Sequence, residues 1–70
     1  MTFKEFTKWC NARACDGNWG LHHVLTCTGI YNEIKEIPFW KRERVFQNKY
    51  AKHVYEEIVK PINEKIKFKG

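Results

Sequence analysis

The segment from Phe39 to Lys60 constrains the fold most, because it is the longest stretch without a glycine or a proline. Such a stretch favours one long helix, and its apolar side chains recur at helical spacing. The stripe predicted to face the core contains Phe39, Phe46, Tyr50, Val54 and Ile58, with Trp40 and Ala51 at its edge. The opposite side carries Lys41, Arg44, Val45, Asn48, Lys52, Tyr55 and Val59, and Arg42, Lys49 and Lys60 lie between.

A helix is predicted before this segment, at the start of the chain. Thr2 and Glu5 have the spacing of a capping box, in which a hydroxyl and a carboxylate satisfy amides of the first turn. A stripe at helical spacing follows, made of Phe3, Phe6, Cys10 and Ala14. The run Asp16-Gly17-Asn18 should end this helix, with Asn18 or Asp16 capping the next one and Trp19 folding back over the junction.

A second helix is predicted over about 19–36. The residues expected to face its neighbours form a wide arc: Leu21, Val24, Leu25, Cys27, Thr28, Tyr31 and Ile34. Pro38 ends this helix and suits the first turn of the next one. Pro61 should kink or break the third helix before a final turn or two, although the charged and apolar alternation of residues 65–70 also fits a frayed or extended end.

These patterns predict one all-α domain, residues 1–70: a three-helix bundle with a short C-terminal helical extension after Pro61. The helices are expected at about 2–14, 19–36, 38–60 and 61–68. A chain of 70 residues is marginally stable on its own, but its eleven aromatic residues make a core feasible.

The positive charge is concentrated in the second half of the chain. Residues 1–38 hold four basic and four acidic side chains, whereas residues 39–70 hold nine basic and four acidic ones, which accounts for the whole net charge of +5. This asymmetry predicts an anionic partner or, alternatively, a solvated helix face that serves solubility. We expect a cytoplasmic protein, because the charged start does not resemble a signal peptide and no stretch is apolar enough for a membrane span.

Cysteine and histidine side chains are one set of candidates for chemistry. The candidate zinc ligands are Cys15, His22, His23 and Cys27, but their spacing differs from that of common zinc sites and no Cys-x-x-Cys pair is present. Cys10 and Cys27 fall on apolar stripes, where a free cysteine behaves as a small hydrophobic residue. No orienting group accompanies a Cys–His pair, so we expect neither a cofactor nor enzymatic activity.

The basic face of the third helix is the predicted binding surface. Its members are Lys41, Arg42, Arg44, Asn48, Lys49, Lys52 and Tyr55, with Trp40 close by. Lysine and arginine can neutralise phosphates or carboxylates, and aromatic rings can stack. A helix-turn-helix DNA reader has a similar outline, but Phe39-Trp40 at the start of this helix is expected to be buried against the other two helices. Glu43–Gln47 and Lys52–Glu56 contacts across a solvated face are the structural alternative.

Three segments, MTFKEFTKW, ACDGNWG and PFWKRE, give the chain a resemblance to the small proteins rich in lysine and aromatic residues that phages and prophages of low-GC bacteria encode. The resemblance implies a stoichiometric binder that blocks a host defence or nucleic-acid machine, as anti-CRISPR proteins do. We therefore expect a non-enzymatic inhibitor-like protein that binds an acidic or nucleic-acid-handling host protein. The alternatives are a small DNA-binding regulator and a homodimeric interaction module.

Overall fold

In the computed structural model the backbone is described for residues 1–17 and 20–69, and side chains are described as far as Lys65. Every secondary-structure element in this part of the chain is helical, which confirms the all-α fold class. The expected positions of Asn18 and Trp19 lie outside the described residues.

Helix α1 (Phe3–Asp16) has the predicted signals at its two ends, Thr2 before it and Gly17 after it. The Thr2 side chain accepts a hydrogen bond from the Glu5 amide, and the Glu5 side chain accepts one from the Thr2 amide, so the capping box is confirmed. Gly17 has a φ of 67°, the left-handed conformation that glycine adopts without steric cost at a helix C-terminus. The helix extends to Asp16, two residues beyond the expected end.

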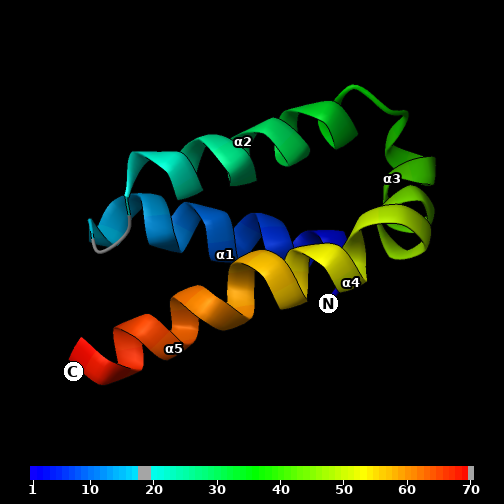
Figure 1. Ribbon diagram of the computed structural model, residues 1–70. Helices are drawn as coiled ribbons and strands as arrows, with labels where there is room; N and C mark the ends of the chain where they lie inside the picture. The colour runs from blue at the N-terminus through cyan, green and yellow to red at the C-terminus, as the bar shows by residue number, and fades with distance from the viewer. Residues whose placement is uncertain (18–19, 70) are drawn as a thin grey trace.

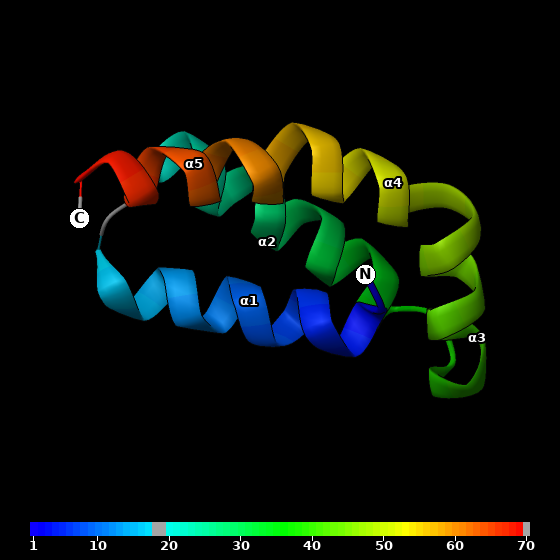
Figure 2. The same cartoon turned by 90° about the horizontal axis from the view of Figure 1, so that it is seen from below.

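Helix α2 (Leu21–Lys35) runs back alongside α1, so the two helices form a hairpin (Figure 1, Figure 2). It ends three residues before Pro38, because the residue preceding a proline avoids the helical region.

From Phe39 the chain is helical to Lys69, but it is not one straight helix. Two π-helical turns, η1 (Phe46–Tyr50) and η2 (Tyr55–Val59), separate α3 (Phe39–Val45), α4 (Ala51–Val54) and α5 (Lys60–Lys69). The turns close when the amide of Ala51 donates to the Phe46 carbonyl and that of Lys60 donates to the Tyr55 carbonyl.

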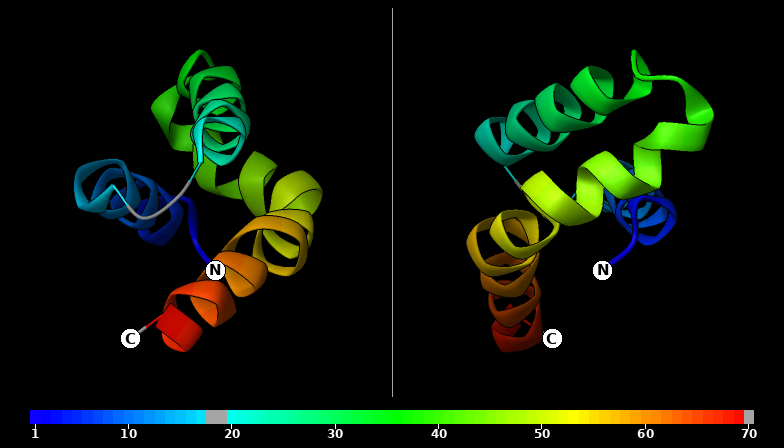
Figure 3. Two further views of the ribbon diagram at one scale, coloured as in Figure 1. Left: turned by 60° about the vertical axis from the view of Figure 1, so that its left-hand side comes forward. Right: turned by 90° about the vertical axis from the view of Figure 1, so that its right-hand side faces the viewer.

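Each π turn inserts one residue, which rotates the following residues by about 100° relative to an ideal α-helix. Around η1 the helix also changes direction, so α3 points away from the axis shared by α4 and α5 (Figure 1, Figure 3). The second turn lies directly before Pro61, whose ring would clash with a regular preceding turn. Of the expected kink or break at Pro61, a break is wrong, because the backbone stays helical through the proline; the irregularity in the helix is the π turn before it.

The core lies where α1, α2 and the α4–α5 axis converge. Its buried residues are Phe6, Cys27, Ile34, Phe46, Ala51, Val54, Ile58, Val59 and Ile62. The Phe46 ring lies at the centre, with its centroid 5.4 Å from that of Phe6 and 5.8 Å from that of Phe3. Because α1 and the segment after α3 supply these rings, the aromatic contacts hold distant parts of the chain together.

The aromatic pair at the start of α3 is exposed, which corrects the expectation that it is buried. Phe39 is 75% exposed and Trp40 is 69% exposed. The reason is the position of α3 at the end of the hairpin, where its first turn extends past the core (Figure 1).

Other burial predictions also fail. Val59 is expected on the solvent side but is buried, because the π turns shift the register of the stripe. The residues that are expected to face the core but are exposed are Ala14, Leu21, Leu25 and Thr28. The arc of α2 that contacts other helices is thus narrower than expected.

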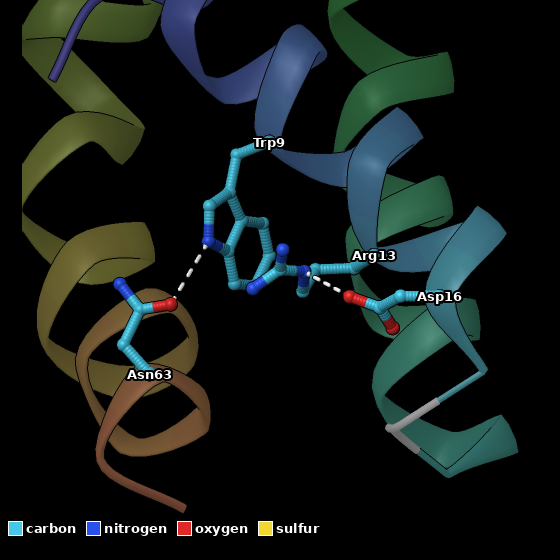
Figure 4. Close-up of polar contacts among 4 residues, drawn as sticks. All are labelled: Trp9, Arg13, Asp16 and Asn63. Atoms are coloured by element: carbon cyan, nitrogen blue, oxygen red, sulfur yellow. Dashed lines mark hydrogen bonds and ion pairs between the residues drawn. The ribbon is translucent and has the colours of Figure 1, made fainter. Parts of the chain in front are cut away.

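A polar contact joins α1 to α5. The Trp9 indole Nε1 donates a hydrogen bond to Asn63 Oδ1 at 3.3 Å (Figure 4). On the other side of the indole, the Arg13 guanidinium lies 5.9 Å from the ring centroid and its Nε is 2.8 Å from the Asp16 carboxylate. The C-terminal helix is therefore held against α1 by the Trp9–Asn63 hydrogen bond as well as by the core.

Candidate functional site

A groove of about 570 Å³ lies between α1 and α2 and is closed at one end by α3. It is lined by Phe3, Lys4, Thr7, Lys8, Asn11, Tyr31, Lys35, Phe39, Arg42 and Glu43. The lining contains four basic side chains and one acidic side chain, and its exposed surface is more apolar than polar. This combination makes the groove a candidate site for an anionic ligand with an apolar part.

Aromatic rings form the apolar part of the groove. The Phe3 ring stacks on the Tyr31 ring with a centroid separation of 5.9 Å and an interplanar angle of 19°. Phe3 also contacts Phe46, so the wall of the groove is continuous with the core. Phe39 closes the end of the groove and leaves three quarters of its surface exposed.

The lysines of the groove come from both helices. Lys4 and Lys8 are one turn apart on α1, and Lys35 lies in the last turn of α2. The Lys35 ammonium lies 5.7 Å from the centroid of the Tyr31 ring. None of the described carboxylates forms an ion pair with these three lysines, so their charge remains available to a ligand.

Arg42 has a structural role that the sequence did not indicate. Its Nε donates to the Ile37 carbonyl at 2.8 Å and its Nη2 donates to the Lys35 carbonyl at 2.9 Å. Carbonyl groups at a helix C-terminus lack intrahelical partners and carry partial negative charge, so a guanidinium stabilises them. Arg42 therefore fixes the corner between α2 and α3, and only part of its guanidinium faces the groove.

Glu43 performs the corresponding role at the start of α1. Its carboxylate accepts hydrogen bonds from the amides of Phe3 at 3.2 Å and Lys4 at 3.3 Å. Gln47 donates to the Met1 carbonyl at 2.7 Å and lies 3.5 Å from the Glu43 carboxylate, so the predicted Glu43–Gln47 contact is confirmed. These bonds dock the N-terminus of α1 onto α3.

The predicted basic face of the third helix is divided in the structure. Lys41, Arg44, Asn48, Lys49, Lys52 and Tyr55 are all exposed, whereas Arg42 is half-buried. The π turn η1 contains Asn48 and Lys49. It adds one residue between Lys41 and Arg44 before it and Lys52 and Tyr55 after it, so the exposed side chains do not share the single stripe expected for a straight helix.

Near η1, a contact with α2 involves Tyr50. The Tyr50 hydroxyl donates a hydrogen bond to the Glu33 carboxylate, which raises the pKa of Tyr50, and the Lys49 ammonium lies 5.3 Å from the Tyr50 ring centroid. The exposed Lys49 side chain thus also contacts the ring that links η1 to α2.

Within the described part of the chain, the candidate zinc ligands do not converge. No group of three or more His, Cys, Asp or Glu side chains there is arranged to hold a metal ion. Cys15 is exposed and Cys27 is buried, while the His22 and His23 rings contact each other at 5.8 Å.

Cys27 pairs instead with Cys10 across the α1–α2 interface, as two free thiols. The hydrogen bond to Cys27, together with burial, raises the pKa of the Cys10 thiol. Both side chains therefore belong to the packing between the helices, as their apolar positions in the sequence predict.

The lysines of the groove are absent from the surface predicted from the sequence. Lys4 and Lys8 have the four-residue spacing that places side chains on the same helix face, and this spacing could have indicated a basic surface on the first helix. The signal is faint because the first half of the chain has no net charge, whereas the second half carries the whole excess. Lys35 joins them only through the hairpin, which the spacing of residues in the sequence does not specify.

No protein-family model, curated protein or solved structure gives a significant match to the chain. Among the described residues, no helix is long and apolar enough to cross a membrane. The fold and the site together define an all-helical protein with a basic, aromatic-lined groove.

Proposed function

We propose that this chain is a small non-enzymatic binding protein, a three-helix bundle with a C-terminal extension, that engages an acidic protein partner in the cytoplasm. The contact surface is the corner between α2 and α3, where Phe39 and Trp40 project beside Lys41 and Arg44. The resemblance to phage-encoded binders supports an inhibitory role, in which occupying the partner's acidic surface blocks its access to nucleic acid.

The exposed aromatic pair is the observation that carries this proposal. The Phe39 and Trp40 rings meet edge to face, with centroids 5.2 Å apart and an interplanar angle of 83°. Exposing two large rings to water is unfavourable, and contiguous exposed apolar surface commonly marks an interaction site. Tryptophan and arginine are enriched among the residues that contribute most to protein–protein affinity.

The surrounding charge supports an acidic partner. Lys41 and Arg44 are exposed in the same short helix as the aromatic pair, and the three groove lysines are in the adjacent α1 and α2. Clustered positive charge accelerates association with a negative surface and disfavours basic partners.

Affinity purification from a host-cell lysate tests this function, with the captured protein identified by mass spectrometry and then purified for direct binding measurements. We expect Trp40→Ala to weaken binding by about tenfold or more, because the complex would lose a tryptophan side chain that the partner buries. Leu25→Ala is the matched control, since Leu25 is 61% exposed on a different part of the surface.

Three results would contradict the proposal. Retention of the partner by Trp40→Ala would exclude the corner as the contact. Steeply salt-dependent binding of duplex DNA by the isolated protein would favour the DNA-binding alternative. A homodimer in solution that dissociates in the Trp40→Ala variant would show that a second copy covers the aromatic pair.

A further inference from the structure

We infer that the groove between α1 and α2 receives an acidic segment of a protein partner, anchored by one bulky apolar side chain. This inference rests on the proposed binding function and assigns the chemistry of the ligand. The groove adjoins the proposed contact surface because Phe39 belongs to both.

The charge of the groove matches a segment with several carboxylates. Lys4 and Lys8 lie along α1, and Lys35 lies on α2, so cations are placed on both sides of the groove. Unlike Arg42 and Glu43, these lysines make no hydrogen bond or ion pair with the described residues that would occupy their charge. Carboxylates on an extended segment can therefore bind to either side without displacing an existing ion pair.

The apolar lining accounts for the anchor side chain. Phe3 and Tyr31 are partly buried, and Phe39 leaves a large surface at the closed end of the groove. An aromatic or aliphatic side chain of the partner would remove this surface from water, which is favourable in proportion to the apolar area covered. The exposed amide of Asn11, also in the lining, can hydrogen-bond to the backbone of the segment.

The ring contacts favour a peptide over single-stranded nucleic acid. Bases bind by stacking on free ring faces in succession along a strand. Here Phe3 stacks on Tyr31 and also contacts Phe46. The Lys35 ammonium lies over the Tyr31 ring, and the Phe39 and Trp40 rings meet edge to face. A nucleic acid would gain phosphate contacts but few stacking contacts, whereas an apolar side chain does not require a free ring face.

The open shape of the groove favours a polymer segment over a small molecule. Small-molecule sites typically enclose roughly 70–90% of the ligand surface. This groove is open to solvent along one side, although its volume of about 570 Å³ would accommodate such a ligand. An extended segment can occupy an open groove because the rest of its chain makes further contacts outside.

The test uses a labelled random copolymer of glutamate and tyrosine, with fluorescence anisotropy to measure affinity. Polyglutamate and oligo(dT), of similar length, serve as comparison probes. The groove variant is Lys8→Glu/Lys35→Glu, and the control is Lys60→Glu/Lys65→Glu, which changes the net charge equally at exposed positions outside the groove.

We expect the copolymer to bind more tightly than either comparison probe. The groove variant should lose about tenfold or more in affinity, whereas the control should lose about twofold or less. Titration should shift the backbone NMR signals of Lys8, Asn11 and Tyr31. Circular dichroism verifies folding, and Lys8→Gln/Lys35→Gln replaces the groove variant if charge reversal unfolds it, with an expected loss in the same direction.

Equal losses in the two variants would overturn the inference, because net charge alone would then explain binding. Equal affinity for polyglutamate and the copolymer would exclude the apolar anchor, and tighter binding of oligo(dT) through the groove would identify a nucleic-acid site. A failure of the inference is distinguishable from a failure of the proposed function. A partner that is retained by the groove variant but lost by Trp40→Ala would contradict the groove alone.

Discussion

The side chains of Thr2 and Glu5, three residues apart and in contact, define the start of the first helix. The Glu5 carboxylate accepts hydrogen bonds from the Thr2 amide at 3.2 Å and the Thr2 hydroxyl at 2.9 Å. The hydrogen bond from the Thr2 side chain, followed by that from its backbone, lowers the pKa of Glu5 below its ordinary value of 4.5. The ionised carboxylate therefore stabilises the folded state.

Thr2→Ala should raise the pKa of Glu5 towards 4.5. Separately, loss of the N-cap hydrogen bond from the Glu5 amide to the Thr2 hydroxyl should destabilise the protein by about 1 kcal/mol. The folded protein favours the ionised form of Glu5. The stabilisation by this carboxylate is therefore present above pH 4.5 and is lost as the pH falls through the lower pKa that Glu5 has in the folded state. NMR titration of Glu5 and denaturant unfolding at several pH values measure both effects. Thr26→Ala is the control, since its hydroxyl donates to the His22 carbonyl within a helix; an equal shift of Glu5 in that variant would contradict the capping explanation.

Arg42 and Glu43 form hydrogen bonds that their positions in the sequence did not predict. Both are charged residues in a helix with a basic face, and the sequence assigned Arg42 to partner binding and Glu43 to a solvated contact. Their main partners are instead backbone groups of α2 and α1. Backbone partners are set by how the helices pack, and a side-chain pattern carries no information about them.

At the scale of the elements, two glycines have opposite energetic roles. Gly17 has positive φ at the end of α1, a conformation that disfavours any residue with a Cβ atom. Gly29 lies within α2, and a Cβ atom added there would meet nothing within 4 Å. Glycine inside a helix costs stability because it loses more backbone entropy than alanine on folding.

Gly17→Ala should destabilise the protein by about 1 kcal/mol, and Gly29→Ala should stabilise it by about 1 kcal/mol. Thermal and denaturant unfolding of both variants measure the two effects, and each variant is the control for the other. A destabilised Gly29→Ala protein would show that another element approaches α2 at this position.

The helix boundaries were largely predictable, whereas the path of the third helix was not. Capping residues, Gly17 and Pro38 specify local conformations, so they indicate where helices begin and end. The π turns alter the register by one residue each, and a projection at a constant angle cannot represent them. The sequence does contain an indication of these shifts in register. In Tyr50-Ala51 and in Ile58-Val59, two consecutive apolar residues both contact the core, which a regular helix with a single apolar stripe does not require.

The same distinction applies to the site. The charge pattern predicted a basic binding surface from Lys41 to Tyr55, whose binding role stays a prediction, whereas Phe39 and Trp40 were expected to be buried. The groove could not be predicted, because it forms only when α1, α2 and α3 meet. The exposure of Phe39 and Trp40 could not be predicted from the sequence either, because the helical spacing from Phe39 to Phe46 is typical of a stripe that faces the core.

For the molecule as a whole, Phe46 is one of the largest side chains of the core. It is fully buried and contacts Phe3 and Phe6, while Phe39 belongs to the same helical segment but is largely exposed. Domains of this size have small net stability, because they bury a small fraction of their surface. One core cavity can therefore remove much of the free energy of unfolding.

Phe46→Ala should destabilise the protein by about 3–5 kcal/mol, which corresponds to a decrease in Tm of about 12 °C or more. Phe39→Ala removes the same ring from a surface position and should change the free energy of unfolding by about 0.5 kcal/mol or less. Differential scanning calorimetry compares the two variants. Similar losses in both would mean that Phe39 is covered in solution, in contrast to its exposure here.

The Phe3 ring connects the wall of the groove to the core. It stacks on Tyr31 in the wall of the groove and contacts Phe46 in the core, so the wall exists only while the helices are assembled. Thermodynamic linkage then requires that a ligand of the groove protects the chain against unfolding. A ligand present at a hundred times its Kd would add about 2.7 kcal/mol to the free energy of unfolding. The melting temperature of the chain is thus itself an assay for ligands of the groove, and a rise in it reports binding whatever the chemical identity of the ligand.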